Sequence, residues 1–176
     1  MTTTINASTS SGLVTTPDNS GTVALQGNGA TGLTVNSSGI VNTPLRPAFD
    51  AYGTVGNVLF TTDTPIPLNS TTFNIGSNYS TSTYRFTAPV AGIYFFRAQV
   101  YKQASGNASR LRLYKNAADV RVYQYISATD TYTFGITGVI SLTVGDYVTC
   151  NFNSDGAGTN IYLADNHTNF SGYLVG

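Results

Sequence analysis

The stretch from Tyr79 to Phe96 reads YSTSTYRFTAPVAGIYFF, and it decides the fold. An aromatic run leads into a Thr-Ala-Pro turn, after which Gly-Ile-Tyr-Phe-Phe begins a long apolar segment. Tyr, Phe and Ile suit the pleated, half-buried surface of a strand, whereas Pro and Gly suit the turn before it. The stretch therefore predicts the entry into a long, buried β-strand.

Beyond Pro47 the chain repeats this pattern to its end. Runs with a period of two residues alternate with turn residues, which is the spacing of an antiparallel sandwich. No segment shows the periodicity of a helix. We therefore predict an all-β jelly roll of about ten antiparallel strands in two sheets. The predicted strands are 48–52, 58–62, 71–75, 83–87, 92–102, 110–116, 120–127, 132–142, 146–153, 161–163 and 171–175.

The aromatic spacing carries a family resemblance. Four, six and five residues separate Asn74, Tyr79, Phe86 and the segment that begins at Gly92. Two further segments match the same pattern, LTVGDYV at 142–148 and FSGYLV at 170–175. The chain thus resembles the globular head of complement first component q, a relative of tumour necrosis factor. The resemblance covers residues 47–176 and implies a homotrimeric jelly roll, although Leu68 and Ala98 stand where that family has aromatic rings.

Several positions are expected to be structural. We expect rings to fill the sandwich or the trimer axis, and glycines to lie where a side chain would clash or where φ must be positive. Asp146 should bond backbone amides in the turn before its strand. The predicted rings are Phe86, Tyr94, Phe96, Phe170 and Tyr173, and the predicted glycines are Gly92, Gly145 and Gly172.

Two predicted strands carry apolar or aromatic residues on both faces. They are 93–96, with the sequence IYFF, and 122–126, with the sequence VYQYI. A sandwich with one hydrated face does not require this, so we expect identical copies to cover the second face in a symmetric trimer. The alternative is that the tyrosines are ordinary half-exposed strand residues, because Tyr favours strands and is amphipathic.

Residues 1–46 differ in composition from the remainder. No aromatic residue precedes Phe49, and Asp18 is the only charged residue before Arg46. Such a segment cannot bury enough apolar area to fold alone. Segments 22–26 and 32–36 nevertheless alternate like short strands that need a partner surface. We predict two parts, an extended arm over 1–46 that anchors or intertwines and a jelly-roll domain over 47–176.

Composition limits the partners. Charged residues make up 9% of the chain and the formal net charge is zero, so no long-range field attracts nucleic acid. No run approaches the roughly 18 apolar residues of a membrane span, and the N-terminus has no secretion signal. We expect a soluble protein made in a cytoplasm, with no membrane insertion. Cys150 is the only cysteine, which excludes an internal disulfide and predicts a buried strand thiol.

No motif supports catalysis, a cofactor or a metal site. The only imidazole is His167, and the eight acidic residues are scattered aspartates without any glutamate. A calcium site is the one metal alternative. Oxygen ligands lie at 153–156 and 165–166, and the resembled family includes calcium-binding members, but an Asp-Gly pair is also an ordinary turn. We predict that the chain is not an enzyme and binds neither metal nor cofactor.

The stretch from Ser11 to Gln26 resembles a segment found in tail-fibre and other virion proteins of bacteriophages. The leading hypothesis is therefore a trimeric capsid decoration, or cement, protein that exposes a jelly-roll knob on the outer surface of the particle, after assembly in the host cytoplasm. Residues 1–46 would bind the major capsid protein or a tail adaptor. The alternative is the tip of a tail fibre or tailspike that binds host surface carbohydrate through tyrosine-bearing loops near Tyr101, Tyr123 and Tyr132. An enzyme, or an adhesive or signalling jelly roll from another source, is a further alternative.

Overall fold

The computed structural model describes residues 20–103, 107–127, 132–164 and 167–176. Within those ranges all regular structure is β-strand, and the chain divides into two compact units, Met1–Leu45 and Arg46–Gly176. The prediction of an all-β fold without helices is confirmed for the described residues.

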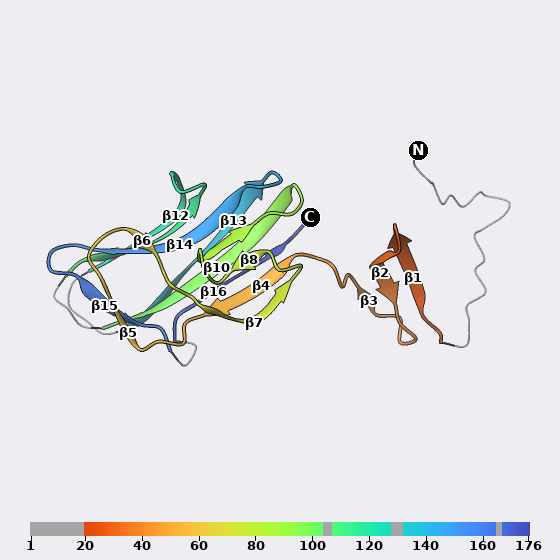
Figure 1. The fold of residues 1–176 in the computed structure, drawn as a ribbon, viewed down its shortest axis with the longest axis horizontal. Coiled ribbons are helices and arrows are strands. Elements are labelled where there is room, and N and C mark those ends of the chain that lie inside the picture. Colours follow the sequence, from red (N-terminus) through yellow and green to blue (C-terminus); the bar gives the residue numbers. More distant parts are fainter. Residues whose placement is uncertain (1–19, 104–106, 128–131, 165–166) are drawn as a thin grey trace. The chain divides into compact units, whose positions relative to one another are not determined.

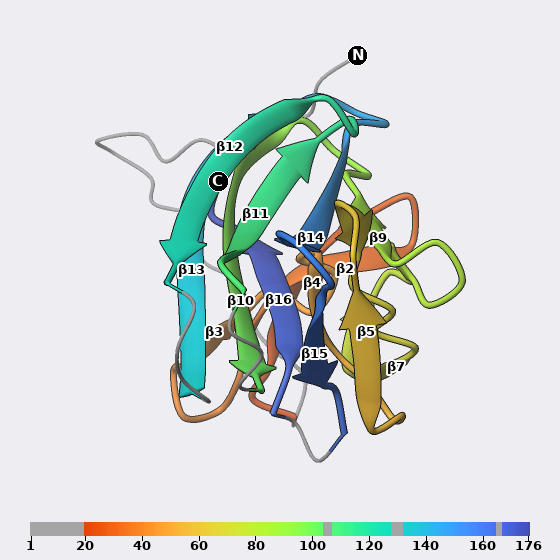
Figure 2. The same cartoon turned by 90° about the vertical axis from the view of Figure 1, so that its left-hand side faces the viewer.

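The second unit is a sandwich of two antiparallel sheets (Figures 1 and 2). The seven-stranded sheet has the order β5 (Asn57–Phe60), β15 (Thr159–Tyr162), β10 (Gly92–Lys102), β16 (Asn169–Leu174), β4 (Ala48–Tyr52) and β7 (Ser70–Ile75), and β13 (Tyr132–Leu142) pairs with β10. The six-stranded sheet has the order β12 (Asp119–Ile126), β11 (Ser109–Lys115), β14 (Tyr147–Ser154), β9 (Arg85–Thr87) and β8 (Tyr79–Ser80), and β6 (Thr64–Pro65) pairs with β14.

The strand entry quoted above forms β10, the longest strand together with β13. Its side chains alternate, so that every second one from Tyr94 onward is buried between the sheets. The packed centre is aromatic. Phe49 of β4 stacks on Tyr79 and on Phe86 with ring centroids 5.0 Å apart in each pair, and it meets the edge of Phe170 at 5.0 Å. Strand alternation therefore directs one face of each sheet into a shared core.

The first unit holds three strands, β1 (Val23–Gly27), β2 (Ala30–Val35) and β3 (Val41–Asn42). Asn28 and Gly29 both have positive φ, 49° and 78°, as in the two-residue turns that favour hairpins. The two short strands predicted in the arm therefore pair mainly with each other. Large apolar side chains of this unit are exposed, among them Val23, Leu25, Ile40, Val41 and Leu45.

Some predicted boundaries are wrong. The strand predicted over 83–87 begins only at Arg85, because Tyr84 has φ of +56°, which breaks an extended run. Three two-residue strands, β3, β6 and β8, escaped prediction because so short a segment shows no alternation.

Candidate interaction surfaces

The predicted ring residues fall into two groups. Phe86, Tyr94, Phe96 and Phe170 are all fully buried in the core of the sandwich. Tyr173 is 46% exposed and lies on the outer face of the seven-stranded sheet, so it does not fill the sandwich. Its neighbours along β16, Gly172 and Leu174, have the opposite orientation because strand residues alternate between faces.

The three predicted glycines are placed where space or conformation is restricted. A Cβ on Gly172 would lie 2.5 Å from Cδ1 of Phe96 and 2.9 Å from the carbonyl oxygen of Phe95. A Cβ on Gly92 would lie 2.6 Å from Cδ1 of Leu174. Gly145 has φ of +86°, in the left-handed region that L side chains rarely adopt.

Asp146 closes the turn between β13 and β14. Its carboxylate accepts hydrogen bonds from the backbone N–H of Thr143 at 2.8 Å and from Nδ2 of Asn116 at 2.7 Å. Nζ of Lys115 lies 2.8 Å from Oδ2 of the same carboxylate. The bond from Asn116, followed by those from Lys115 and Thr143, lowers the pKa of Asp146 well below its ordinary value. The side chain thus ties this turn to the β11–β12 loop.

Replacement of Asp146 by Asn is expected to lower stability at neutral pH. The substitution removes the negative charge that pairs with Lys115 and strengthens the hydrogen bond from the Thr143 N–H. Since folding depresses this pKa, the carboxylate stabilises the fold above the unfolded pKa of about 3.9, and that stabilisation disappears as the pH falls through the folded pKa. The urea midpoints of the parent and Asp146→Asn should differ by a constant amount from pH 7 to about 5, and the difference should shrink at lower pH. A difference that persists unchanged under acid conditions would contradict this role.

The outer face of the seven-stranded sheet carries an apolar row. Register places Val139 of β13, Phe95 of β10, Tyr173 of β16 and Ala48 of β4 side by side across the four strands. The rings of Phe95 and Tyr173 lie 5.4 Å apart, and Val139 is 66% exposed. Half-buried Ile75 of β7, which lies opposite Ala48, continues this row, and exposed Ile93 extends the apolar region along β10. Contiguous exposed apolar surface of this kind marks an interface.

The adjacent row on this face is polar and carries both signs of charge. Arg97 of β10 lies opposite Ser171 of β16, which lies opposite Asp50 of β4. The guanidinium of Arg97 donates to Oε1 of Gln99 at 2.6 Å and to Oδ1 of Asn169 at 3.3 Å. Within the described residues neither Arg97 nor Asp50 has an ion-pair partner. A depression of about 310 Å³ lies beside Arg97, and its lining includes Gln99 of β10 and Gly135 of β13.

The outer face of the six-stranded sheet has a different chemistry. Arg110 and Arg112 of β11 lie directly opposite Tyr125 and Tyr123 of β12. The guanidinium carbon of Arg110 lies 5.6 Å from the centroid of the Tyr125 ring, and that of Arg112 lies 5.5 Å from the Tyr123 ring. We call these four residues the Arg–Tyr ladder. Sequence analysis missed it, although the period-two spacing of both pairs was visible, because which strands are neighbours depends on topology.

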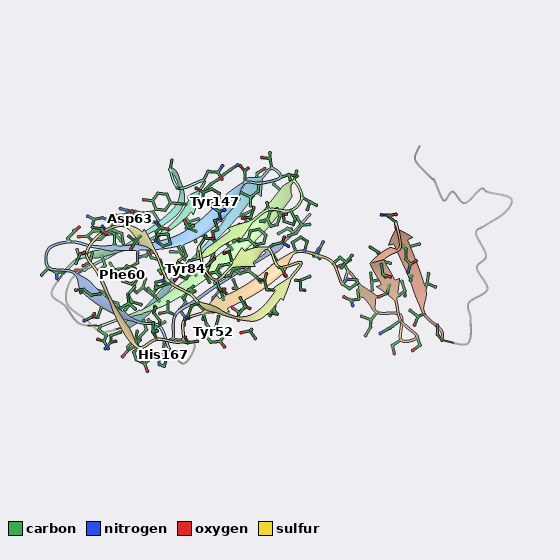
Figure 3. All side chains as sticks on the ribbon, in the orientation of Figure 1. Tyr52, Phe60, Asp63, Tyr84, Tyr147 and His167 are labelled. Atoms are coloured by element: carbon green, nitrogen blue, oxygen red, sulfur yellow. The ribbon has the colours of Figure 1, made fainter. Side chains whose placement is uncertain are left out.

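Each arginine of the ladder has an acidic partner. Arg110 forms an ion pair with Asp155, which also accepts from Nη2 at 3.1 Å, and the bonds from Arg110 lower the pKa of Asp155. Arg112 forms an ion pair with Asp63, which is labelled in Figure 3. The hydroxyl of Tyr114 donates to the same Asp63 carboxylate at 2.5 Å. Both positive charges are therefore balanced within the protomer.

The other candidate residues are held by ordinary contacts. His167 packs edge-on against Tyr101 and Tyr162, with ring centroids 5.3 Å away in each case, and its Nδ1 lies 3.1 Å from the carbonyl oxygen of Ala164. Cys150 is buried, as predicted, and burial raises the pKa of its thiol.

The structure also places most of the residues named for the calcium and sugar alternatives. In the described ranges no three His, Cys, Asp or Glu side chains come together as a metal site, and the Asp155 carboxylate is held by Arg110. Asp165 and Asn166 lie outside the described residues. The tyrosines expected in loops lie in strands instead, Tyr101 in β10 and Tyr132 in β13 of the seven-stranded sheet and Tyr123 in β12 of the six-stranded sheet. No helix with the length and apolarity of a membrane span occurs in the described part of the chain.

Comparison with known proteins agrees with this architecture. The profile of the C1q domain matches residues 48–175. The globular domain of zebrafish complement 1qA superposes with a TM-score of 0.58 at 21% identity, covering 74% of this chain and 98% of that one. Mouse APRIL has a TM-score of 0.60 at 12% identity and covers 74% and 99%, and the Eiger TNF of S. frugiperda has 0.56 at 12% and covers 74% and 94%. At these low identities the structural similarity supports the fold alone, whereas the profile match identifies the family. The chain belongs to the C1q domain family.

Proposed function

We propose that this chain is a non-enzymatic homotrimer in which neighbouring copies cover the outer face of the seven-stranded sheet. The observation that carries the proposal is the apolar row through Val139, Phe95 and Tyr173, which a lone sandwich leaves in water. C1q and tumour necrosis factor domains are generally non-enzymatic and form homotrimers. Burial of this row around a threefold axis removes it from solvent, which favours association.

The charges on this face support contact between one side of it on one copy and the opposite side on the neighbouring copy. Arg97 lies toward the β13 edge and Asp50 toward the β7 edge, two strands apart. In a ring of three copies, one side of the face on each copy meets the other side of the next copy. Arg97 of one copy then pairs with Asp50 of its neighbour, which gives each charge the partner that it lacks within the protomer. A buried or partly buried pair of this kind fixes register and specificity.

Sedimentation of the purified chain tests the trimer. We expect one species of three times 18.6 kDa. Arg97→Asp and Asp50→Arg should each shift the material toward monomer, because like charges then face one another, and the double variant should restore the trimer. A well-folded parent that sediments as a single 18.6 kDa species would overturn the trimer. Dissociation that the double variant fails to repair would overturn the pairing alone.

For its biological setting, we propose a bacteriophage capsid decoration protein on the outside of the virion. Support comes from the resemblance of the segment Ser11–Gln26 to virion proteins, of which residues 11–19 lie outside the described ranges. It also comes from the three-stranded unit, whose exposed Val23, Leu25 and Val41 need a partner surface. Three such units on one trimer would multiply a weak contact with the major capsid protein.

Particles that lack the protein test this setting. We expect them to lose DNA at a lower temperature, or after a milder osmotic shock, than complete particles. Re-addition of the full chain should restore robustness, whereas a chain that begins at Arg46 should not. Equal robustness with and without the protein would argue against cementing.

The second candidate is a receptor-binding tip that recognises host surface glycan. The Arg–Tyr ladder favours it, because half-exposed tyrosine rings and paired polar groups suit sugar recognition. The purified trimer should then bind host cells, and glycan extracted from those cells should block the binding. Cell binding that extracted glycan leaves unchanged would remove this candidate.

A further inference from the structure

We propose that the Arg–Tyr ladder is a platform for a neutral oligosaccharide, whose sugar rings stack on Tyr123 and Tyr125. This inference rests on the second candidate function and assigns its site. The platform lies on the outer face of the six-stranded sheet, away from the apolar row of the other sheet.

The two rings are held in place and accessible. Tyr123 and Tyr125 are 49% and 50% exposed, and each has a guanidinium over its ring at about the contact distance of a cation–π pair. Because the two residues alternate along one strand, they share a face and lie about 6.6 Å apart along it. The result is a pair of pre-oriented aromatic surfaces, which lowers the entropy cost of stacking a ligand on them.

The arginines are already committed to carboxylates. Asp155 takes two donor nitrogens of Arg110, and Oδ1 of Asn153 accepts a further bond from Nη1 at 3.0 Å. Asp63 takes Arg112 and the Tyr114 hydroxyl. A guanidinium balanced in this way offers little net attraction to a sulfated, phosphorylated or acidic ligand. Charge therefore favours a neutral ligand over an anionic one.

The surrounding surface favours a glycan over a protein partner. Of the described side chains in the strands of this sheet, Tyr123 and Tyr125 are the only large apolar ones that are exposed. Other outward positions on β14 are polar, such as Asn151 and Asn153. The core of a protein interface needs aliphatic or aromatic anchors that exclude water, as the opposite sheet displays with Phe95, Ile93 and Val139. Flat rings among amide and hydroxyl groups instead match the apolar faces and hydroxyls of a sugar.

Binding of the full chain to immobilised neutral hexo-oligosaccharides, including maltohexaose and cellohexaose, tests the platform, with heparin as the anionic arm. We expect retention on a neutral oligosaccharide and none on heparin at physiological salt. Tyr123→Ala/Tyr125→Ala should weaken that binding by about tenfold or more, whereas Tyr123→Phe/Tyr125→Phe should keep most of it, because the stacking surface remains. The matched control Leu59→Ala truncates an exposed side chain on the other sheet and should change nothing.

Several results would overturn the platform. They are retention on heparin alone, no retention on any neutral oligosaccharide, or unchanged retention of the double alanine variant while it sediments like the parent. Cell binding that survives periodate oxidation of the cell glycans but is lost in the double alanine variant would identify a protein partner instead. If extracted glycan blocks cell binding but the alanine variant still binds cells, the site is wrong while the second candidate function stands.

Discussion

Replacement of Phe96 by Ala is expected to lower the free energy of unfolding by about 3–5 kcal/mol, the largest effect of any single truncation considered. The Phe96 ring is fully buried and stacks on Phe170 at 5.8 Å and on Tyr94 at 6.2 Å. It also meets the edge of Phe86 at 5.7 Å. Because these rings come from both sheets, they cannot move far enough to fill the space left by the Phe96 ring, and a cavity remains.

Chemical denaturation at a fixed protomer concentration measures this loss, because association also contributes to apparent stability. Val144→Ala is the matched control, since Val144 is exposed in a turn and its truncation should leave the midpoint close to that of the parent. Denaturation of Phe96→Ala at the parent's midpoint would show that the ring is not packed as described.

Gly172→Ala is expected to destabilise the fold by about 1–3 kcal/mol, although the change adds one methyl group. The added carbon would lie 2.9 Å from the carbonyl oxygen of Phe95 and 2.5 Å from the Phe96 ring. The carbonyl belongs to the paired strand β10 and cannot withdraw without disturbing the sheet, and the ring is confined by its aromatic neighbours. Strand β16 must therefore shift away from β10.

Gly56→Ala is the matched control for this glycine. Its added Cβ would lie 3.7 Å from Cε2 of Tyr162, an ordinary van der Waals contact, so stability should change little. Thermal unfolding of the two variants under identical conditions compares them. Equal unfolding temperatures for Gly172→Ala and the parent would contradict the close approach of β16 and β10.

Features that depend on residues close together in the sequence could be predicted from the sequence. The alternation along 92–102 matched β10 at both ends, because burial on one face of a strand follows directly from period two. The Asp146 turn was also predictable, since a short acidic side chain bonds amides close to it in sequence. Tyr173 could be assigned to a strand, but its residue type did not show whether it faces the core or the surface. The reason is that Tyr has both an apolar ring and a polar hydroxyl.

Contacts across strands could not be predicted in this way. The Arg–Tyr ladder joins residues that are 11 and 15 positions apart, and its ion pairs join β11 to residues more than 40 positions away. Arg97 and Asp50 likewise share a row only because β16 lies between β10 and β4.

The sequence by itself determined the class of fold, the longer strands of the sandwich and the family, because periodicity, turn residues and aromatic spacing are local features of the chain. Only the tertiary structure decided which side chains meet on the two outer faces, one apolar with unpaired charges and the other a set of tyrosines backed by neutralised arginines. The physical reason is that strand order and register bring distant residues into contact, and neither can be read from the order of residues along one strand.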